Sequence, residues 1–292
     1  MRDPSFSVLY GDLKFGKTCA AIAAFGDHAN YVAAPGALES AESVLGIDVP
    51  PRIDLETFRD IRVYDKFPVG KIARVVDDAS LIADRTVNAL AAKGMQGFDL
   101  WSAVFKHAIL LRDDLRRNGQ HVVFTCHAVA AEVKNGVRLK GGPAFPGQTR
   151  TKLPAAADLL LRAESRPGAG FGWPVVFRAG PHDDWLQGSR YDTPDMAPMN
   201  LGEILRAAGF QLPRVKGLEW QETIANGLAN TLLGGRLVDR EQTKEALQRA
   251  RDYAIVKFSK NEKHVMWAVR DGYDRAILKM AERAQHTGLW GF

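Results

Sequence analysis

Two glycines and a lysine–threonine pair near the N-terminus constrain this chain more than any other feature. Gly11 is followed after four residues by Gly16-Lys17-Thr18, which fits the spacing G-x-x-x-x-G-K-[ST] at every fixed position. The apolar run Ser7–Tyr10 before it predicts a buried strand, and the run Lys17–Phe25 predicts a helix. A strand, a glycine-rich turn and a helix in this order are typical of a parallel α/β sheet.

The same loop predicts a phosphate-binding site. Its backbone N–H groups and the positive end of the helix dipole converge on one point, which suits a nucleoside triphosphate. Lys17 is expected to contact the β- and γ-phosphates, and the Thr18 hydroxyl is expected to bind Mg²⁺. The residues expected around the phosphates are Gly11, Asp12, Leu13, Lys14, Phe15, Gly16, Lys17, Thr18 and Cys19. The alternative is a chance match to a glycine-rich loop.

The first two thirds of the chain alternates apolar runs with amphipathic segments, which predicts an α/β fold with a mainly parallel sheet flanked by helices. The expected strands are Ser7–Tyr10, Asn30–Ala34, Ile61–Tyr64, Ala73–Asp77, His121–Thr125, Asp158–Ala163 and Val175–Ala179. The expected helices are Lys17–Phe25, Glu39–Leu45, Ser80–Lys93 and Gly97–Asn118. From about Leu218 the pattern is helical only, including Arg240–Phe258 and Asn261–Gln285. We therefore expect a nucleotide-binding domain over residues 1–213 and a helical C-terminal region over 214–292.

A pair of acidic residues ends one of the predicted strands. Asp77 and Asp78 follow the apolar run Ala73–Val76, at the edge of the sheet where the loop is also expected. Asp77 is expected to bind Mg²⁺ through its waters, and Asp78 to polarise the attacking water. The alternative is that the two residues cap the following helix.

The next predicted strand also ends in polar side chains. Thr125 and His127 follow the run His121–Phe124, so they should lie beside the γ-phosphate. We predict that His127 senses this phosphate, although a single histidine can equally be an ordinary polar residue at the end of a strand.

In the order and spacing of these motifs, residues 5–210 resemble the RecA-like ATPases, above all phage-encoded members implicated in single-strand annealing and recombination. Gly11–Thr18 resembles the Walker A motif, and Val75-Val76-Asp77 the Walker B motif. The resemblance implies a RecA-like core that hydrolyses ATP with Mg²⁺, as a homo-oligomer with ATP between subunits. Arg162, Arg178 or Arg190 could then act on the phosphates of the neighbouring subunit.

The chain departs from the RecA-like pattern at one position. In those enzymes the strand after the first helix ends in a glutamate that activates water, whereas Pro35 and Gly36 stand near that position here. Asp78 could supply the base, Glu39 could reach the site, or hydrolysis could be slow. Loss of a water-positioning group lowers turnover and leaves binding intact, so the sequence predicts nucleotide binding more directly than rapid hydrolysis.

The segment from Lys134 to Lys152 is rich in glycine and proline and contains no acidic residue. In RecA-like proteins the corresponding loop is mobile and contacts DNA. The resemblance therefore implies a contact with single-stranded DNA, and the cations would neutralise phosphates irrespective of base sequence. The expected contact residues are Lys134, Arg138, Lys140, Arg150 and Lys152. The alternative is a solvated loop, since Phe145 is its one aromatic residue for base stacking.

The 292-residue chain carries a net charge of +5, which is compatible with a nucleic-acid partner. The sequence shows no apolar run of membrane-spanning length, no signal peptide and no Cys/His cluster with metal-ligand spacing. Cys19 and Cys126 lie in apolar surroundings and are expected to be buried, reduced thiols. We expect a cytoplasmic protein without membrane contact, in the host cytoplasm if the chain is phage-encoded.

Three functions fit these observations. The first is a RecA-like ATPase that acts on single-stranded DNA in recombination or replication. The second is a phage packaging or assembly motor with the same ATP chemistry. The third is a nucleotide-binding structural or assembly protein with weak hydrolysis, which the missing glutamate favours.

Overall fold

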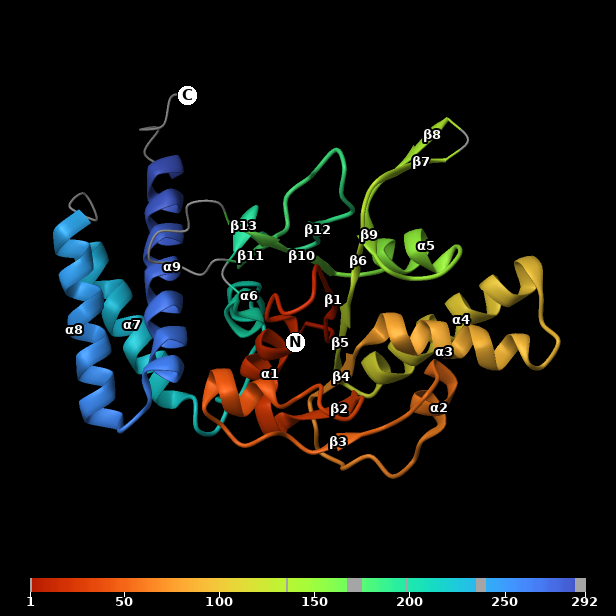
Figure 1. Ribbon diagram of the computed structural model, residues 1–292, viewed down its shortest axis with the longest axis horizontal. Coiled ribbons are helices and arrows are strands. Elements are labelled where there is room, and N and C mark those ends of the chain that lie inside the picture. Colours follow the sequence, from red (N-terminus) through yellow and green to blue (C-terminus); the bar gives the residue numbers. More distant parts are fainter. Residues whose placement is uncertain (1, 135, 167–174, 198, 235–239, 287–292) are drawn as a thin grey trace.

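The computed structural model describes residues 2–134, 136–166, 175–197, 199–234 and 240–286. It is an α/β structure with a mostly parallel central sheet, flanking helices and a helical C-terminal region (Figure 1). The strands of the sheet are β1 (Phe6–Tyr10), β2 (Ala29–Ala33), β3 (Arg52–Ile53), β4 (Ala73–Asp77), β5 (His121–Cys126), β10 (Leu159–Ser165), β11 (Val175–Arg178), β12 (Gly188–Ser189) and β13 (Met196–Ala197).

The strand order is β13-β11-β10-β1-β5-β4-β2-β3, with β12 paired to β10. The strands from β10 to β3 run parallel, whereas β11, β12 and β13 are antiparallel additions. Because β5 lies between β1 and β4, the carboxyl ends of all three strands meet at one edge of the sheet. We call this the carboxyl edge.

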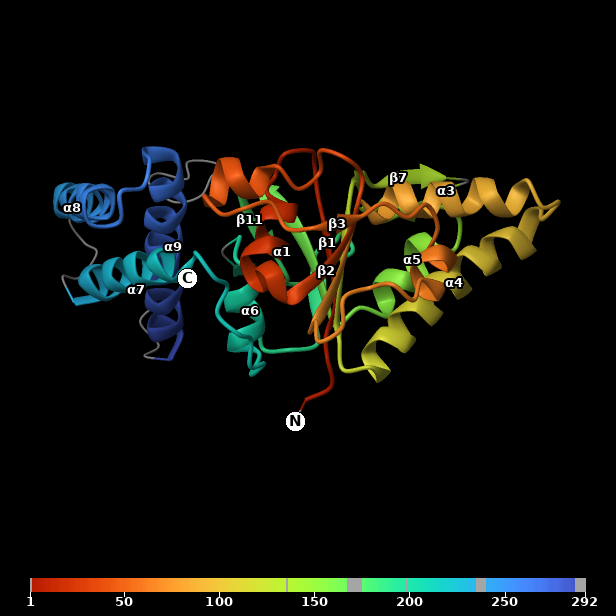
Figure 2. The ribbon, with the colours of Figure 1, turned by 90° about the horizontal axis from the view of Figure 1, so that it is seen from below.

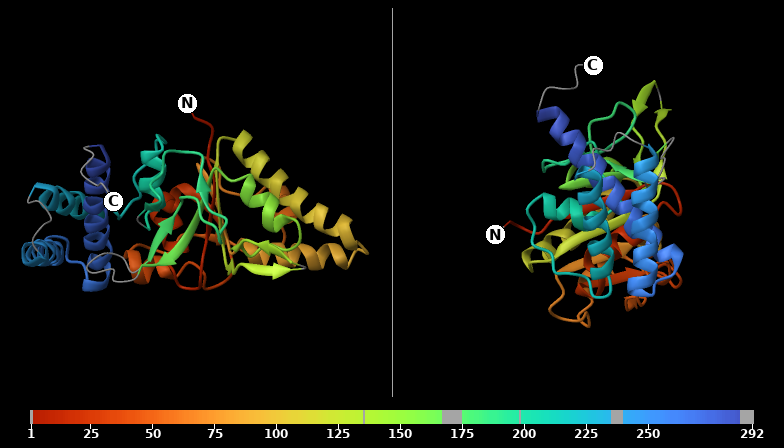
Figure 3. Two further views of the ribbon diagram at one scale, coloured as in Figure 1. Left: turned by 90° about the horizontal axis from the view of Figure 1, so that it is seen from above. Right: turned by 90° about the vertical axis from the view of Figure 1, so that its left-hand side faces the viewer.

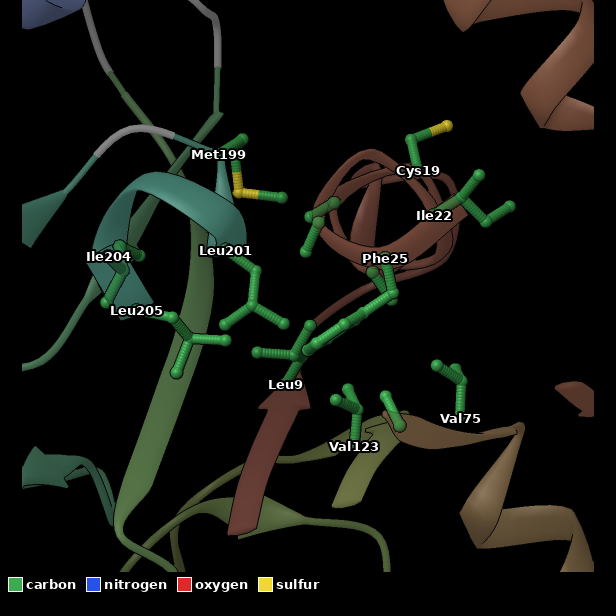
Figure 4. Close-up of a cluster of buried hydrophobic side chains, with 14 of the residues drawn as sticks. Leu9, Cys19, Ile22, Phe25, Val75, Val123, Met199, Leu201, Ile204 and Leu205 are labelled. Carbon is green, nitrogen blue, oxygen red and sulfur yellow. The ribbon is translucent and has the colours of Figure 1, made fainter. Parts of the chain in front are cut away.

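Successive side chains of a strand point to opposite faces, so the sheet has two buried faces. On one face, Leu9, Val123 and Val75 lie in the cluster that also contains Ile22 and Phe25 of helix α1 (Lys17–Phe25). Figure 4 shows this cluster together with Leu201 and Leu205 of α6 (Leu201–Ala207). Val8, Phe124 and Val76 belong to the cluster on the other face. Both faces being apolar explains why these strands are continuous hydrophobic runs.

The second face is covered by four helices, on the side opposite α1 and α6 (Figure 2). They are α2 (Phe58–Val63), α3 (Ala79–Ala91), α4 (Gly97–Arg117) and α5 (Thr149–Ala155). The α3–α4 hairpin extends away from the sheet at one end of the molecule (Figure 3).

Two sequence predictions are corrected here. The strand expected at Ile61–Tyr64 is wrong, because residues 58–63 form helix α2. The Thr57 side chain caps this helix by accepting from Asp60 N, and Phe58 and Ile61, three residues apart, are buried on one face. The helix expected at Glu39–Leu45 is a short π-helix, η2 (Ala41–Leu45).

The loop expected between Lys134 and Lys152 is also wrong. Strands β7 (Glu132–Lys134) and β8 (Val137–Leu139) pair antiparallel, and β9 (Gly142–Pro143) pairs with β6 (Ala128–Val129). Helix α5 then begins at Thr149. We call residues 134–152, which carry Lys134, Arg138, Lys140, Arg150 and Lys152, the basic segment.

The C-terminal helices are α7 (Glu219–Gly234), α8 (Arg240–Phe258) and α9 (Glu262–His286), close to the helices expected from the sequence. They form a hydrophobic cluster of their own at the end of the molecule opposite the α3–α4 hairpin (Figures 1 and 3). Trp267 of α9 is buried in the cluster that contains α1, and Asn200 beside α6 donates to Asp271 of α9. Among the described residues, no helix is both long and apolar enough to cross a membrane.

Candidate functional site

The Gly11–Thr18 loop joins β1 to α1 at the carboxyl edge. A Cβ atom on Gly11 would lie 2.7 Å from the carbonyl oxygen of Ala163 in β10, so only glycine fits here. Gly16 has φ +80° and stands at the N-cap of α1, where it brings no side chain to the first-turn N–H groups. The first turn of α1 therefore keeps the open, positive N-terminus that an anion requires.

Lys17 lies inside this loop with 9% of its surface exposed. Its Nζ donates to the carbonyl oxygens of Gly11 and Asp12, at 3.0 and 2.6 Å. Burial lowers the pKa of Lys17, and the nearby carboxylates of Asp78 and Asp77 oppose that shift. The ammonium group thus holds the loop through neutral carbonyls, which phosphate oxygens could replace.

Asp77, the last residue of β4, faces α1 and is 8% exposed. The Thr18 hydroxyl lies 3.1 Å from both of its carboxylate oxygens, and Thr125 of β5 donates to Oδ1. Burial raises the pKa of Asp77, although the hydrogen bonds from Thr125 and Thr18 counteract it. A hydroxyl and a carboxylate side by side are hard oxygen ligands, so the donor set fits Mg²⁺.

Asp78 and His127 form a pair beside Asp77. Asp78 caps α3 through Oδ1, which accepts from Ser80 N at 2.6 Å, and its Oδ2 lies 2.5 Å from His127 Nε2. The backbone N–H of His127 donates to the Ser80 hydroxyl at 3.0 Å. The capping interpretation is thus confirmed for Asp78, while Asp77 contacts the loop instead.

The remaining loop residues differ in exposure. Asp12, Leu13 and Lys14 are exposed, and Phe15 packs against the cluster around α1. Cys19 is buried, which raises the pKa of its thiol, and its Sγ lies 3.9 Å from the carbonyl oxygen of Ser40. Cys126 is buried as well, and its pKa is also raised by burial.

The end of β2 carries no acidic side chain. Ala33 pairs with Asp77, and the chain continues through Pro35 and Gly36. Glu39 is exposed in the following turn, where its Oε2 lies 3.8 Å from the Cβ position of Gly36. Glu39 therefore lies beyond the strand end and shows no hydrogen bond to Asp77, Lys17 or Thr18.

Cations of the basic segment form ion pairs and hydrogen bonds that its composition does not predict. Arg138 forms an ion pair with Asp184, and Arg150 pairs with Glu132 at 2.6 Å. Both acidic partners lie outside residues 134–152, which is why the sequence of the segment did not reveal them.

Other members of the basic segment also have partners. Lys140 donates to the His182 carbonyl oxygen at 2.6 Å, and Lys152 donates to Gln148. The side chain of Lys134 lies outside the described residues. Phe145 is 4% exposed, so it offers no stacking surface.

The three arginines considered as trans-acting groups all have partners within the chain. Arg162 and Arg178 pair with Glu164, at 2.9 and 2.8 Å, and Arg190 pairs with Asp158 at 3.2 Å. Arg162 is almost fully buried, so it is the least accessible to a neighbouring subunit.

The sequence did not single out Ser80. Its hydroxyl accepts the His127 N–H, and so connects α3 to the end of β5. The signal was its place two residues after Asp78, the usual spacing of a capping interaction.

No protein-family model matches this chain, and a search of curated proteins found no significant relative.

Proposed function

We propose that this chain binds ATP with Mg²⁺ and hydrolyses it as a RecA-like ATPase. The observation that carries the proposal is the meeting of Thr18 with Asp77, 3.1 Å apart, next to the buried ammonium group of Lys17. These residues come from positions far apart in the sequence and supply a hydroxyl, a carboxylate and a cation at one helix N-terminus.

Each group has a role in this proposal. The N–H groups of the loop and Lys17 bind the phosphates, and Thr18 and Asp77 hold Mg²⁺, which neutralises phosphate charge when bound. Asp78 and His127 lie at the same edge, where a water molecule would attack. The position of β5 between β1 and β4 supports a RecA-like core, because it places the polar end of β5 beside the loop.

We further propose that single-stranded DNA is the polymer on which the protein acts, as a homo-oligomer. Strands β7 and β8 extend from the body of the protein (Figure 1). Most of the Arg138 side chain on β8 is exposed. Its ion pair with Asp184 must be exchanged for a phosphate contact, so the binding should be weak and salt-dependent.

The experiment that tests this proposal measures ATP hydrolysis without DNA, with single-stranded DNA and with duplex DNA. Stimulation by single strands is expected. Stimulation by duplex alone would favour a packaging motor, and nucleotide binding without turnover would favour an assembly protein.

The DNA contact has its own test. Replacing Arg138, Lys140 and Arg150 together by glutamine should weaken single-strand binding. The slope of the logarithm of affinity against the logarithm of salt concentration should fall by the equivalent of about three phosphate contacts. Unchanged affinity and an unchanged salt slope would remove the basic segment from the proposal.

A further inference from the structure

We infer that His127 is the base that accepts the proton of the attacking water, and that Asp78 is its positioning residue. This inference rests on the proposed ATPase function, and it assigns the role that the missing glutamate leaves open at Pro35 and Gly36.

The pair has the geometry of a carboxylate–imidazole unit. Asp78 Oδ2 lies 2.5 Å from His127 Nε2, a hydrogen-bond distance that favours the tautomer with its proton on Nε2. Nδ1 then carries the free lone pair, and within the described chain no hydrogen bond to it is found. The His127 side chain is 45% exposed, so water can reach the ring.

Two hydrogen bonds with Ser80 hold the pair in place. Asp78 is anchored as the cap of α3 through Ser80 N, and the Ser80 hydroxyl accepts the backbone N–H of His127. Because both Asp78 oxygens already accept hydrogen bonds, this carboxylate is better suited to orienting the imidazole than to taking a proton from water.

The pair lies at the phosphate end of the site. Asp78 directly follows Asp77, whose carboxylate lies 3.1 Å from the Thr18 hydroxyl, and His127 stands two residues after Thr125, which also donates to Asp77. Glu39, the other candidate, is exposed in a turn beyond the end of β2. His127 is therefore the proton acceptor that we assign at this edge.

The step balances as follows. The water oxygen forms a bond to the γ-phosphorus, and the bond from that phosphorus to the bridging oxygen breaks, leaving its electron pair on ADP. The water proton moves to Nδ1 of His127, and Asp78 stabilises the resulting imidazolium. Release of that proton to solvent restores the pair.

The test compares His127→Gln, Asp78→Asn and the double variant in nucleotide binding, turnover number and melting temperature. Asparagine keeps the cap of α3 but can hold the imidazole in the wrong tautomer. We expect each single change to lower the turnover number by about 100-fold or more, with nucleotide affinity changed less than about threefold. The double variant should be no slower than the slower single variant, because the two residues act as one unit.

Two further arms separate catalysis from structure. Asp84→Asn removes an exposed carboxylate from the same helix and should leave the turnover number unchanged. Added imidazole should partly restore turnover in His127→Ala, which a purely structural role would not allow.

The outcomes are distinguishable. A wild-type protein that does not bind ATP would end both the proposed function and this inference. A wild-type protein that binds ATP but does not hydrolyse it would end the proposed hydrolysis together with this inference and leave only nucleotide binding. A His127→Gln variant with normal turnover would overturn this inference alone.

Discussion

Two aspartates are buried at opposite edges of the same sheet, and they differ in what surrounds them. Asp77 at the carboxyl edge is 8% exposed and receives hydrogen bonds from the hydroxyls of Thr18 and Thr125. Asp158, just before β10, is 5% exposed and accepts the backbone N–H of Phe6 at 2.9 Å. It also pairs with two arginines, Arg116 at 3.3 Å and Arg190 at 3.2 Å.

The comparison shows that burial of a carboxylate does not by itself mark a functional site. Asp158 is neutralised by cations and serves to hold β1, α4 and the segment before Tyr191 together. Asp77 pairs directly with no cation among its described contacts, so its charge remains available to a divalent metal ion.

The largest expected effect is the loss of stability when the Asp158 carboxylate is removed. Asp158→Ala leaves two arginines and one buried N–H without their acceptor, so the free energy of unfolding should fall by about 3–4 kcal/mol. Urea unfolding measures this change. Asp192→Ala, which removes an exposed carboxylate nearby, is the control and should have little effect. An equal effect of both substitutions would contradict the stabilising role assigned to Asp158.

His121, the first residue of β5, lies at the edge of the sheet opposite the carboxyl edge and predicts a pH dependence of stability. Burial, and secondarily the charge of Arg116, lowers the pKa of His121 to about 4, and Ser5 N donates to its Nδ1 at 3.1 Å. The unfolded chain binds this proton near pH 6.5, whereas the folded protein does not. Stability should therefore be complete above pH 6.5 and fall by about 3 kcal/mol on acidification to pH 4.

The measurement is urea unfolding at several pH values, with His121→Gln as the comparison. The glutamine oxygen can accept from Ser5 N but does not titrate, so the variant should lose less stability between pH 6.5 and 4. Identical pH curves for the two proteins would contradict the assignment.

At the carboxyl edge, Asp77 should contribute a pH dependence of stability with the opposite sign. Because burial raises the pKa of Asp77, the ionised form costs stability in the folded protein without ligand. Asp77→Asn should therefore raise the free energy of unfolding and the melting temperature at pH 7. This gain should vanish as the pH falls below the pKa of the unfolded carboxyl group. Asp158→Asn in the same assay should instead lower the free energy of unfolding. A loss of stability in both variants would contradict the difference drawn between the two aspartates.

Much of the fold was predictable from local patterns. The apolar runs at residues 7–10, 73–77 and 121–125 became β1, β4 and β5, because strands with two buried faces are continuously hydrophobic. The loop was recognisable since its glycines, lysine and threonine have fixed spacing. Asp77 and Thr18 were expected to serve one metal ion, and they lie in contact.

What failed depended on distant partners. The cations of the basic segment looked unpaired in the sequence because their acidic partners, Asp184 and Glu132, lie outside it. Residues 58–63 form a helix instead of the expected strand because Thr57 caps it and because β2 and β3 occupy the adjacent positions of the sheet. The pairing of Asp78 with His127 was equally hidden, since 49 positions separate them and only the adjacency of β4 and β5 joins them.

The most direct test of the central claim is calorimetric titration of ATP, with and without Mg²⁺, into the wild type, Lys17→Ala and Lys66→Ala. Lys66 is exposed in the segment before β4 and serves as the matched control. We expect wild type and Lys66→Ala to bind Mg²⁺-ATP equally, and Lys17→Ala to lose at least about 100-fold in affinity, as for a charged hydrogen-bonding group in a buried site. Equal ATP affinity of Lys17→Ala and wild type would contradict the account.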